Sequence, residues 1–213
     1  MIAFVDAARL PVWDAETLAP IALMDGAALT TLRTPALSAV AARRLAAPDA
    51  RRLVVFGRGP QAHGHVEALR AVLPIEEVVM VGRGDSIEPV RAADVICCCT
   101  TAREPLFDSD LVRDDATVVA IGSHERGARE LDERLMGRAT VVVESRATAL
   151  NECGDVIQAV DAGALDPGAL VTIDALVRGE AAPPHGRPRV FKSAGMAWED
   201  LVVAAAVREA RPD

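Results

Sequence analysis

The sequence lacks an apolar run long enough to cross a membrane, and it has little positive charge. Stretches such as residues 53–56 are far shorter than the roughly 20 apolar residues of a spanning helix. Lys and Arg number 23 against 31 Asp and Glu, a formal net charge of -8, whereas nucleic-acid binding needs a clustered basic surface. We therefore expect neither membrane insertion nor nucleic-acid binding, and small-molecule chemistry is favoured.

Cysteines are few, and three of the four are consecutive: Cys97, Cys98 and Cys99. Adjacent residues of a strand point to opposite faces, so this run suits neither a disulfide framework nor a zinc site. We interpret these residues as reduced core thiols and expect no metal site. The N-terminus has Asp6 and Arg9 behind a short apolar start and no basic leader, so a cytoplasmic location is expected.

The chain also lacks internal repeats, and what it contains instead is an alternation of strands and helices. Short β-branched-rich stretches predict strands buried on both faces, at residues 53–56, 78–81, 95–99, 118–121 and 141–143. Helical patterns lie between several of them, at residues 63–72, 108–111 and 130–137. This order predicts a parallel sheet with right-handed crossovers.

The two ends of the chain add a hairpin and two helices. Residues 12–24 predict two short strands around a turn, and residues 27–46 have apolar positions at helical spacing up to Pro48. Residues 179–188 form a loop rich in Pro and Gly, and a final helix is predicted at about residues 196–208.

The stretch LVVFGRGPQAHGH, residues 53–65, predicts a dinucleotide-binding loop. A strand runs directly into a helix that opens at about Gln61, so backbone N–H groups and the positive helix end would face a pyrophosphate. Gly57 makes the tight turn, Gly59 admits the phosphates, and the small Ala62 lets the helix pack closely. An ordinary strand-to-helix turn is the alternative. The candidate cofactor-binding residues of this loop are Gly57, Arg58, Gly59, Pro60, Gln61 and Ala62.

The end of the second strand bears on which dinucleotide binds. An acidic residue there would hold the ribose hydroxyls of NAD, but Gly82 and Arg83 follow the strand. We expect no carboxylate in this loop to repel a 2′-phosphate and a guanidinium to pair with it, so NADPH or NADP is predicted and NADH is less favoured. Arg83 as a merely solvated charge is the alternative.

Several stretches together resemble the ornithine cyclodeaminase and mu-crystallin family. They follow one another over nearly the whole chain, and the most specific are the Arg-Thr helix, the AIGS…EL segment and the FKSAG segment; the stretches are residues 29–46, 54–78, 93–107, 118–156 and 190–205. The resemblance implies a Rossmann-like, doubly wound, mostly parallel α/β sheet. It also implies an NAD(P)-dependent enzyme acting at the carbon–nitrogen bond of an imino or amino acid.

The resemblance further implies that Arg33 holds the substrate carboxylate. An Arg next to Thr in an apolar amphipathic helix can offer a bidentate fork to a carboxylate, while a surface Arg is the alternative. Lys192, at a strand end, is expected to be solvated, with a role in the site as the alternative. The remaining implied contacts are with the cofactor: Thr34 near a phosphate, Thr100 and Thr101 beside the ribose and nicotinamide, and Ser193 and Gly195 against the nicotinamide.

The sequence departs from the family in length and in the middle of the sheet. Family members carry a longer N-terminal lobe that includes a catalytic lysine, and here only a remnant of it is expected. Only nine residues separate Arg83 from Ala93, so the third Rossmann strand is expected to be missing and the second strand to be an edge. The expected division is the lobe remnant at residues 1–46, the NADP-binding domain at 47–178, and a C-terminal loop and helix that pack back on the N-terminal segment at 179–213.

A histidine replaces an acidic residue of the family. His124 stands where the cyclodeaminases carry an aspartate, and an imidazole could donate a proton to the reduced imine nitrogen. An ordinary loop histidine is the alternative. His63 and His65 are expected to face outward.

The leading hypothesis is an NADP(H)-dependent reductase of imino acids such as Δ1-pyrroline-2-carboxylate. A cofactor-binding protein with little catalysis is a second hypothesis, as the crystallin members suggest. A third is a subunit whose site is completed by a second copy or a partner chain. Apolar surface on the hairpin and on the helix at residues 27–46 predicts an oligomer.

Overall fold

The computed structural model describes residues 1–3, 9–184 and 186–210. Residues 4–8, 185 and 211–213, which include Asp6 and His185, lie outside the described residues. In the described part of the chain, no helix is long and apolar enough to span a bilayer.

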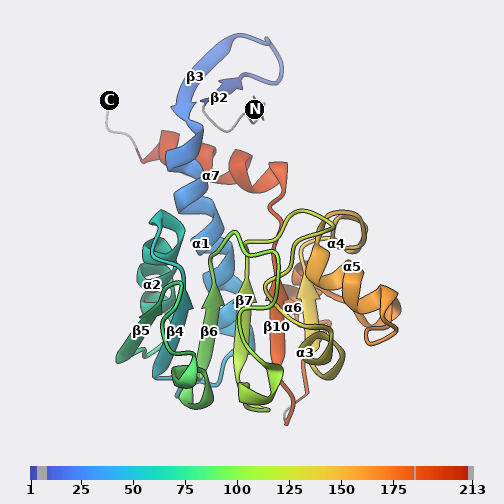
Figure 1. The fold of residues 1–213 in the computed structure, drawn as a ribbon. Helices are drawn as coiled ribbons and strands as arrows, with labels where there is room; N and C mark the ends of the chain where they lie inside the picture. The colour runs from blue at the N-terminus through green and yellow to red at the C-terminus, as the bar shows by residue number, and fades with distance from the viewer. Residues whose placement is uncertain (4–8, 185, 211–213) are drawn as a thin grey trace.

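A seven-stranded parallel sheet forms the body of the molecule (Figure 1). The five predicted strands are all present, and two more strands lie one on either side of β8. In spatial order the strands are β5 (Glu77–Val81), β4 (Arg52–Phe56), β6 (Val95–Cys98), β7 (Thr117–Ala120), β10 (Arg189–Lys192), β8 (Thr140–Val143) and β9 (Val171–Thr172). The predicted α/β class is therefore confirmed.

Helices cover both faces of the sheet, because its strands are apolar on both sides. Along β4, Leu53 and Val55 face one apolar cluster, whereas Val54 and Phe56 face the other. The first cluster is covered by α1 (Gly26–Leu45), α2 (Pro60–Val72) and α6 (Ile173–Arg178). The second is covered mainly by α3 (Glu133–Arg138), α4 (Arg146–Glu152), α5 (Gly154–Asp161) and the 3-10 turns η1 (Glu88–Ala92) and η2 (Ser109–Leu111).

The structure corrects two helix predictions. Residues 108–111 form only the 3-10 turn η2, which Asp108 caps by accepting from the Asp110 N–H. The helix predicted at residues 130–137 begins at Glu133 instead, because Asp132 caps it by accepting from the Leu135 N–H. Residues 146–172, which had no predicted elements, contain α4, α5, the 3-10 turn η3 (Pro167–Ala169) and β9.

Strand β5 is the edge of the sheet, as the short connection after Arg83 predicts. The chain returns from β5 to β6 through η1 alone, so no strand lies beyond β5 within the described residues. The adenine side of a Rossmann-type site is correspondingly thin here.

The predicted N-terminal hairpin projects from the body of the molecule (Figure 1). It consists of β2 (Arg9–Trp13) and β3 (Pro20–Asp25), and β1 (Ile2–Ala3) joins it as a third antiparallel strand. Asp25 ends the hairpin and caps α1 by accepting from the Ala28 N–H. The last helix, α7 (Ala197–Glu209), packs across α1 beneath the hairpin.

A buried ion pair connects β10 to α5. The Lys192 ammonium lies 3.7 Å from the Asp155 carboxylate, and both side chains are fully inaccessible to water. Asp155 also accepts the N–H groups of Glu130 and Leu131 at 2.7 and 2.8 Å and the hydroxyl of Ser123. The prediction that Lys192 is solvated is therefore wrong, because a carboxylate is buried with it.

We expect Asp155→Ala to lower the free energy of unfolding by about 3–5 kcal/mol, since it leaves the Lys192 charge buried without a partner. Lys192→Met removes the charge instead and should cost less. The double variant should be more stable than Asp155→Ala alone. Urea unfolding of the three variants measures this, and an unchanged midpoint for Asp155→Ala would contradict it.

Candidate functional site

The predicted site residues gather at the carboxyl ends of the parallel strands. Gly57 follows β4, Arg83 follows β5, Thr100 follows β6, His124 lies after β7 and Ser193 follows β10. In open α/β sheets, ligands bind in the crevice at this edge. The parallel topology thus brings to one edge residues from five separate segments of the chain.

The loop after β4 is shaped for a close approach of phosphate. Gly57 has φ +108°, and a Cβ there would lie 2.5 Å from the carbonyl oxygen of Cys99, so only glycine fits. At Gly59 a Cβ would meet nothing within 4 Å, so the space before the helix is open. No side chain caps α2, which begins at Pro60, and its free N–H groups and positive end face that space.

The start of α2 is held against α1. The Gln61 side chain donates to the carbonyl of Thr30 at 3.1 Å, and Ala62 is completely buried. A Cβ on Gly64 would lie 3.0 Å from the Pro35 ring, so the two helices pack closely. Thr34 is also buried, on the same helix as Pro35.

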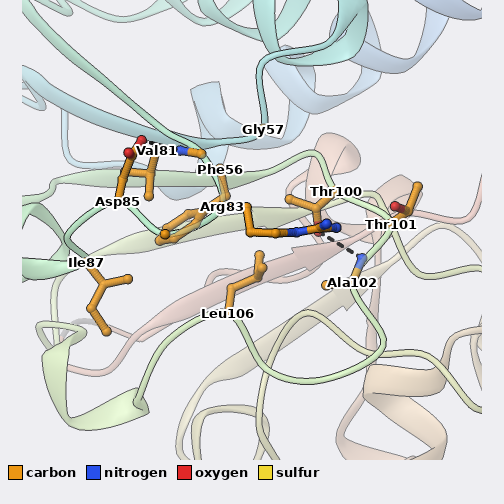
Figure 2. A pocket seen from close by; sticks show the side chains of 12 residues that line it. Phe56, Gly57, Val81, Arg83, Asp85, Ile87, Thr100, Thr101, Ala102 and Leu106 are labelled. Atoms are coloured by element: carbon orange, nitrogen blue, oxygen red, sulfur yellow. Dashed lines mark hydrogen bonds between the residues drawn. The ribbon is translucent and has the colours of Figure 1, made fainter.

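A cavity of about 290 Å³ lies between the ends of β4, β5 and β6 (Figure 2). Four predicted residues line it, and the Arg83 side chain reaches across it in the direction of Thr100. The residues that line it are Phe56, Gly57, Val81, Gly82, Arg83, Gly84, Asp85, Ile87, Thr100, Thr101, Ala102 and Leu106.

The cavity contains a carboxylate that the sequence reasoning overlooked. Asp85 accepts the N–H of Gly82 at 2.7 Å and pairs with Arg58 at 2.7 Å. An Asp at position i+3 of a turn after a strand was the available signal. The expectation that this loop has no carboxylate is therefore wrong, whereas Arg83 is exposed within the described loop.

Arg33 and Gly195, two predicted residues 162 positions apart, are in contact. A Cβ on Gly195 would lie 2.5 Å from Arg33 Nη1, and φ is +85°, so the guanidinium lies directly against the glycine backbone. Arg33 pairs through Nη1 with Glu199 at 3.2 Å and through Nε with Asp200 at 3.3 Å. Its side chain is only 15% exposed, which rules out the alternative of a surface Arg.

Glu144, at the end of β8, holds the turn that contains Ser193 and Gly195. It accepts the Ser193 hydroxyl at 2.5 Å and the Ala194 and Gly195 N–H groups at 2.9 and 3.0 Å. Its negative charge also acts on Glu199. Burial, with repulsion from Glu144, raises the pKa of Glu199 to about 8, although Arg33 opposes the shift. Sequence reasoning missed both acids, since nothing local marks them.

Glu130 joins the turns after β6 and β7. It accepts the Thr100 N–H and hydroxyl at 2.8 and 2.7 Å and the Gly122 N–H at 2.7 Å. Burial raises the pKa of this carboxyl. His124 lies two residues beyond Gly122 in the same loop and is exposed. The loop that carries His124 thus starts beside Thr100.

The other two described histidines and the consecutive cysteines differ in their exposure to solvent. His63 is exposed, as expected, but His65 is completely buried, so the prediction that it faces outward is wrong. Cys97 and Cys98 are buried free thiols whose pKa values are raised by burial. A hydrogen bond with Cys97, together with the neighbouring His65 side chain, lowers the pKa of the half-buried Cys99 to about 6.

A family model described as "Ornithine cyclodeaminase/mu-crystallin family" matches residues 7–86 and 80–212. The chain belongs to this family. The two matched segments meet at the end of β5, where the chain passes to β6 without a further strand.

Two curated relatives are similar to this chain over most of its length. A Delta(1)-pyrroline-2-carboxylate reductase of Bacillus cereus is 34% identical over 212 residues, which cover 87% of this chain and 65% of the relative. The ketimine reductase mu-crystallin of Mus musculus is 37% identical over 207 residues, covering 88% and 64%. The chain thus spans just under two thirds of the length of these relatives.

Solved structures of the family share the fold. Delta(1)-pyrroline-2-carboxylate reductase of Thermococcus litoralis, solved with NADH and L-proline, has a TM-score of 0.90 at 29% identity, covering 94% of this chain and 70% of that one. The iminosuccinate reductase of Paracoccus denitrificans, solved with NAD+, has a TM-score of 0.85 at 26% identity, covering 94% and 69%.

We expect the contribution of Glu199 to stability to fall as pH rises from about 4.5 to 8. Its pKa is about 8 in the folded protein against 4.5 for a free glutamic acid, so the folded state retains a proton that the unfolded state loses in this window. Glu199→Gln should reduce that fall. Melting temperatures across the window measure it, and equal pH slopes for parent and variant would contradict this prediction.

Proposed function

We propose that the protein is a nicotinamide-dependent reductase of imino acids, of the Δ1-pyrroline-2-carboxylate or ketimine kind. The observation that carries this proposal is the Arg33 guanidinium packed on Gly195, at the sheet edge that also carries the dinucleotide loop. The relatives named as reductases of such compounds, and the related structures solved with NADH or NAD+, support it.

The loop fits a dinucleotide. The open space at Gly59 and the uncapped start of α2 suit a pyrophosphate, and Gly57, Arg58, Pro60, Gln61 and Thr34 would surround it. Thr100 and Thr101 would border the ribose, and Ser193 and Gly195 the nicotinamide. The bound cofactor would supply hydride for the C=N bond, and the protein supplies orientation and charge.

Arg33 would orient the substrate by its carboxylate. Arg33 pairs with Glu199 through Nη1 and with Asp200 through Nε. These two ion pairs leave Nη2 for the substrate. Glu199 and Asp200 would hold the guanidinium plane against Gly195 and so direct its remaining donor toward the substrate. Positioning of this kind lowers the barrier by reducing the freedom of the reacting groups.

His124 would protonate the imine nitrogen, directly or through a water. It is exposed on a loop whose first residues are fixed beside Thr100 by Glu130. An exposed imidazole can donate a proton to the substrate nitrogen and regain one from solvent.

The cofactor is proposed to be NADPH rather than NADH. Asp85 neutralises Arg58 through their ion pair, which leaves Arg83 at the cavity as the group for a 2′-phosphate.

The free thiols fit the proposed cytoplasmic location. Association with a second copy or a partner chain also stays a proposal, for which the mass in solution is the measurement. The exposed apolar side chains that such a partner would cover are Leu18, Leu23, Leu32, Trp198, Val202 and Val207.

We expect the purified protein to consume NADPH in the presence of Δ1-pyrroline-2-carboxylate. Arg33→Lys should lower kcat/KM about 100-fold or more, because a single ammonium cannot keep the ion pairs with Glu199 and Asp200 and also donate to the substrate carboxylate. His124→Asn should lower kcat about 100-fold with little change in KM. It should also remove the fall in kcat at high pH, where a proton donor loses its proton.

Binding of NADPH provides the control, since Arg33 does not line the dinucleotide cavity. Both variants should bind NADPH as the parent does. A parent protein that binds NADPH but reduces no imino acid would overturn the reductase proposal and favour a cofactor-binding protein. A fully active His124→Asn would overturn the role of His124 alone.

We expect Arg83→Ala to weaken NADPH binding about tenfold or more and to leave NADH binding nearly unchanged, because only NADPH presents a 2′-phosphate to the guanidinium. Asp85→Asn is the opposite variant. It removes the negative charge from the cavity and should shift the preference further toward NADPH. Fluorescence titration of both dinucleotides measures this. Equal NADPH affinity of Arg83→Ala and parent would contradict the assignment.

A further inference from the structure

A second cluster of reactive side chains lies beneath the dinucleotide loop, and the proposed reductase chemistry uses none of them. Cys97 and Cys99 are two residues apart at the end of β6, so they share a face of the sheet, and their Sγ atoms are 3.5 Å apart. His65 of α2 lies against them on that face. One ligand atom of each of the three residues lies within 4.8 Å of the other two.

The hydrogen bonds of His65 place the ring proton on Nδ1 and the lone pair on Nε2, where a cation would replace the hydrogen bond from Ser38. Nδ1 is 2.7 Å from the carbonyl oxygen of Gln61, and a carbonyl can only accept, so Nδ1 carries the proton. Nε2 is 2.9 Å from the Ser38 hydroxyl, from which it accepts. A backbone carbonyl that holds Nδ1–H and leaves Nε2 as a donor of electrons is the arrangement found behind metal-binding histidines.

We propose that Cys97, Cys99 and His65 bind a thiophilic divalent cation of the zinc type. Two thiolates on a tetrahedral zinc lie about 3.8 Å apart, close to the 3.5 Å found here. A disulfide would instead require the sulfurs to approach to about 2.05 Å. Two sulfurs and an imidazole favour such a cation over magnesium or calcium.

The charge balance also suits a buried site. The two thiol protons leave to solvent as the cation binds, so two thiolates neutralise its double positive charge and the complex is uncharged. Cys97 and His65 are completely buried, and an uncharged complex avoids the cost of burying a net charge. The Ser38 hydroxyl or a water would occupy the fourth position.

The site would join three elements that support the loop. His65 comes from α2, Ser38 from α1, and the cysteines from the end of β6, where the Cys99 carbonyl faces Gly57. The cation would therefore fix the floor of the dinucleotide loop. This inference does not depend on the proposed reductase activity.

Cobalt titration of the reduced, full-length protein tests the site. We expect one equivalent of Co2+ to produce a thiolate-to-metal charge-transfer band that Zn2+ abolishes by displacement. Cys97→Ser and Cys99→Ser should each weaken binding about tenfold or more. Cys98→Ser is the matched control, because Cys98 lies in the cluster on the opposite face of the sheet and should bind as the parent does.

Several results would overturn the proposal. One is a folded, reduced parent that gives no band. Another is a band that survives in both Cys97→Ser and Cys99→Ser, or that is lost in Cys98→Ser. Circular dichroism of each variant separates loss of the site from loss of the fold. If Co2+ does not bind and peroxide instead converts the two thiols to a disulfide, the pair is a redox pair and the metal proposal is wrong.

Discussion

The buried ion pair of Lys192 and Asp155 is the interaction on which the site edge depends. Asp155 accepts the N–H of Glu130, and Glu130 in turn accepts from Thr100 and Gly122. These bonds link β10, α5 and the turns after β6 and β7 through groups that water does not reach. Because a buried charge without its partner costs several kcal/mol, alternative arrangements of these turns are strongly disfavoured.

The strands and the glycine turn that joins β4 to α2 were predictable because their signals are local. Apolar runs buried on both faces indicate parallel strands, and glycines at a strand-to-helix junction indicate a turn with a close phosphate approach. The short connection after Arg83 likewise sufficed to place β5 at the edge. The helix start at Asp132 was missed because a capping carboxylate, rather than apolar periodicity, decides it.

Burial of polar side chains was not predictable, since it depends on partners distant in the sequence. Lys192 and His65 were expected in water, but Asp155 and the Gln61 carbonyl satisfy them inside. The same limit applies to the cysteines. Alternation along a strand correctly separates Cys98 from its neighbours, yet it also places Cys97 and Cys99 on one face, where α2 supplies a histidine.

Helix α1 connects the parts of the site that the sequence keeps apart. Near its middle Arg33 reaches the Gly195 turn and the two acids of α7, Thr30 accepts from Gln61 of the loop helix, and Ser38 reaches His65. The helix therefore sets the distance between Arg33 and the glycine loop after β4. A shift of α1 along its axis would move Arg33 and the start of α2 together, so the packing of Gly64 against Pro35 bears on both parts of the proposed site.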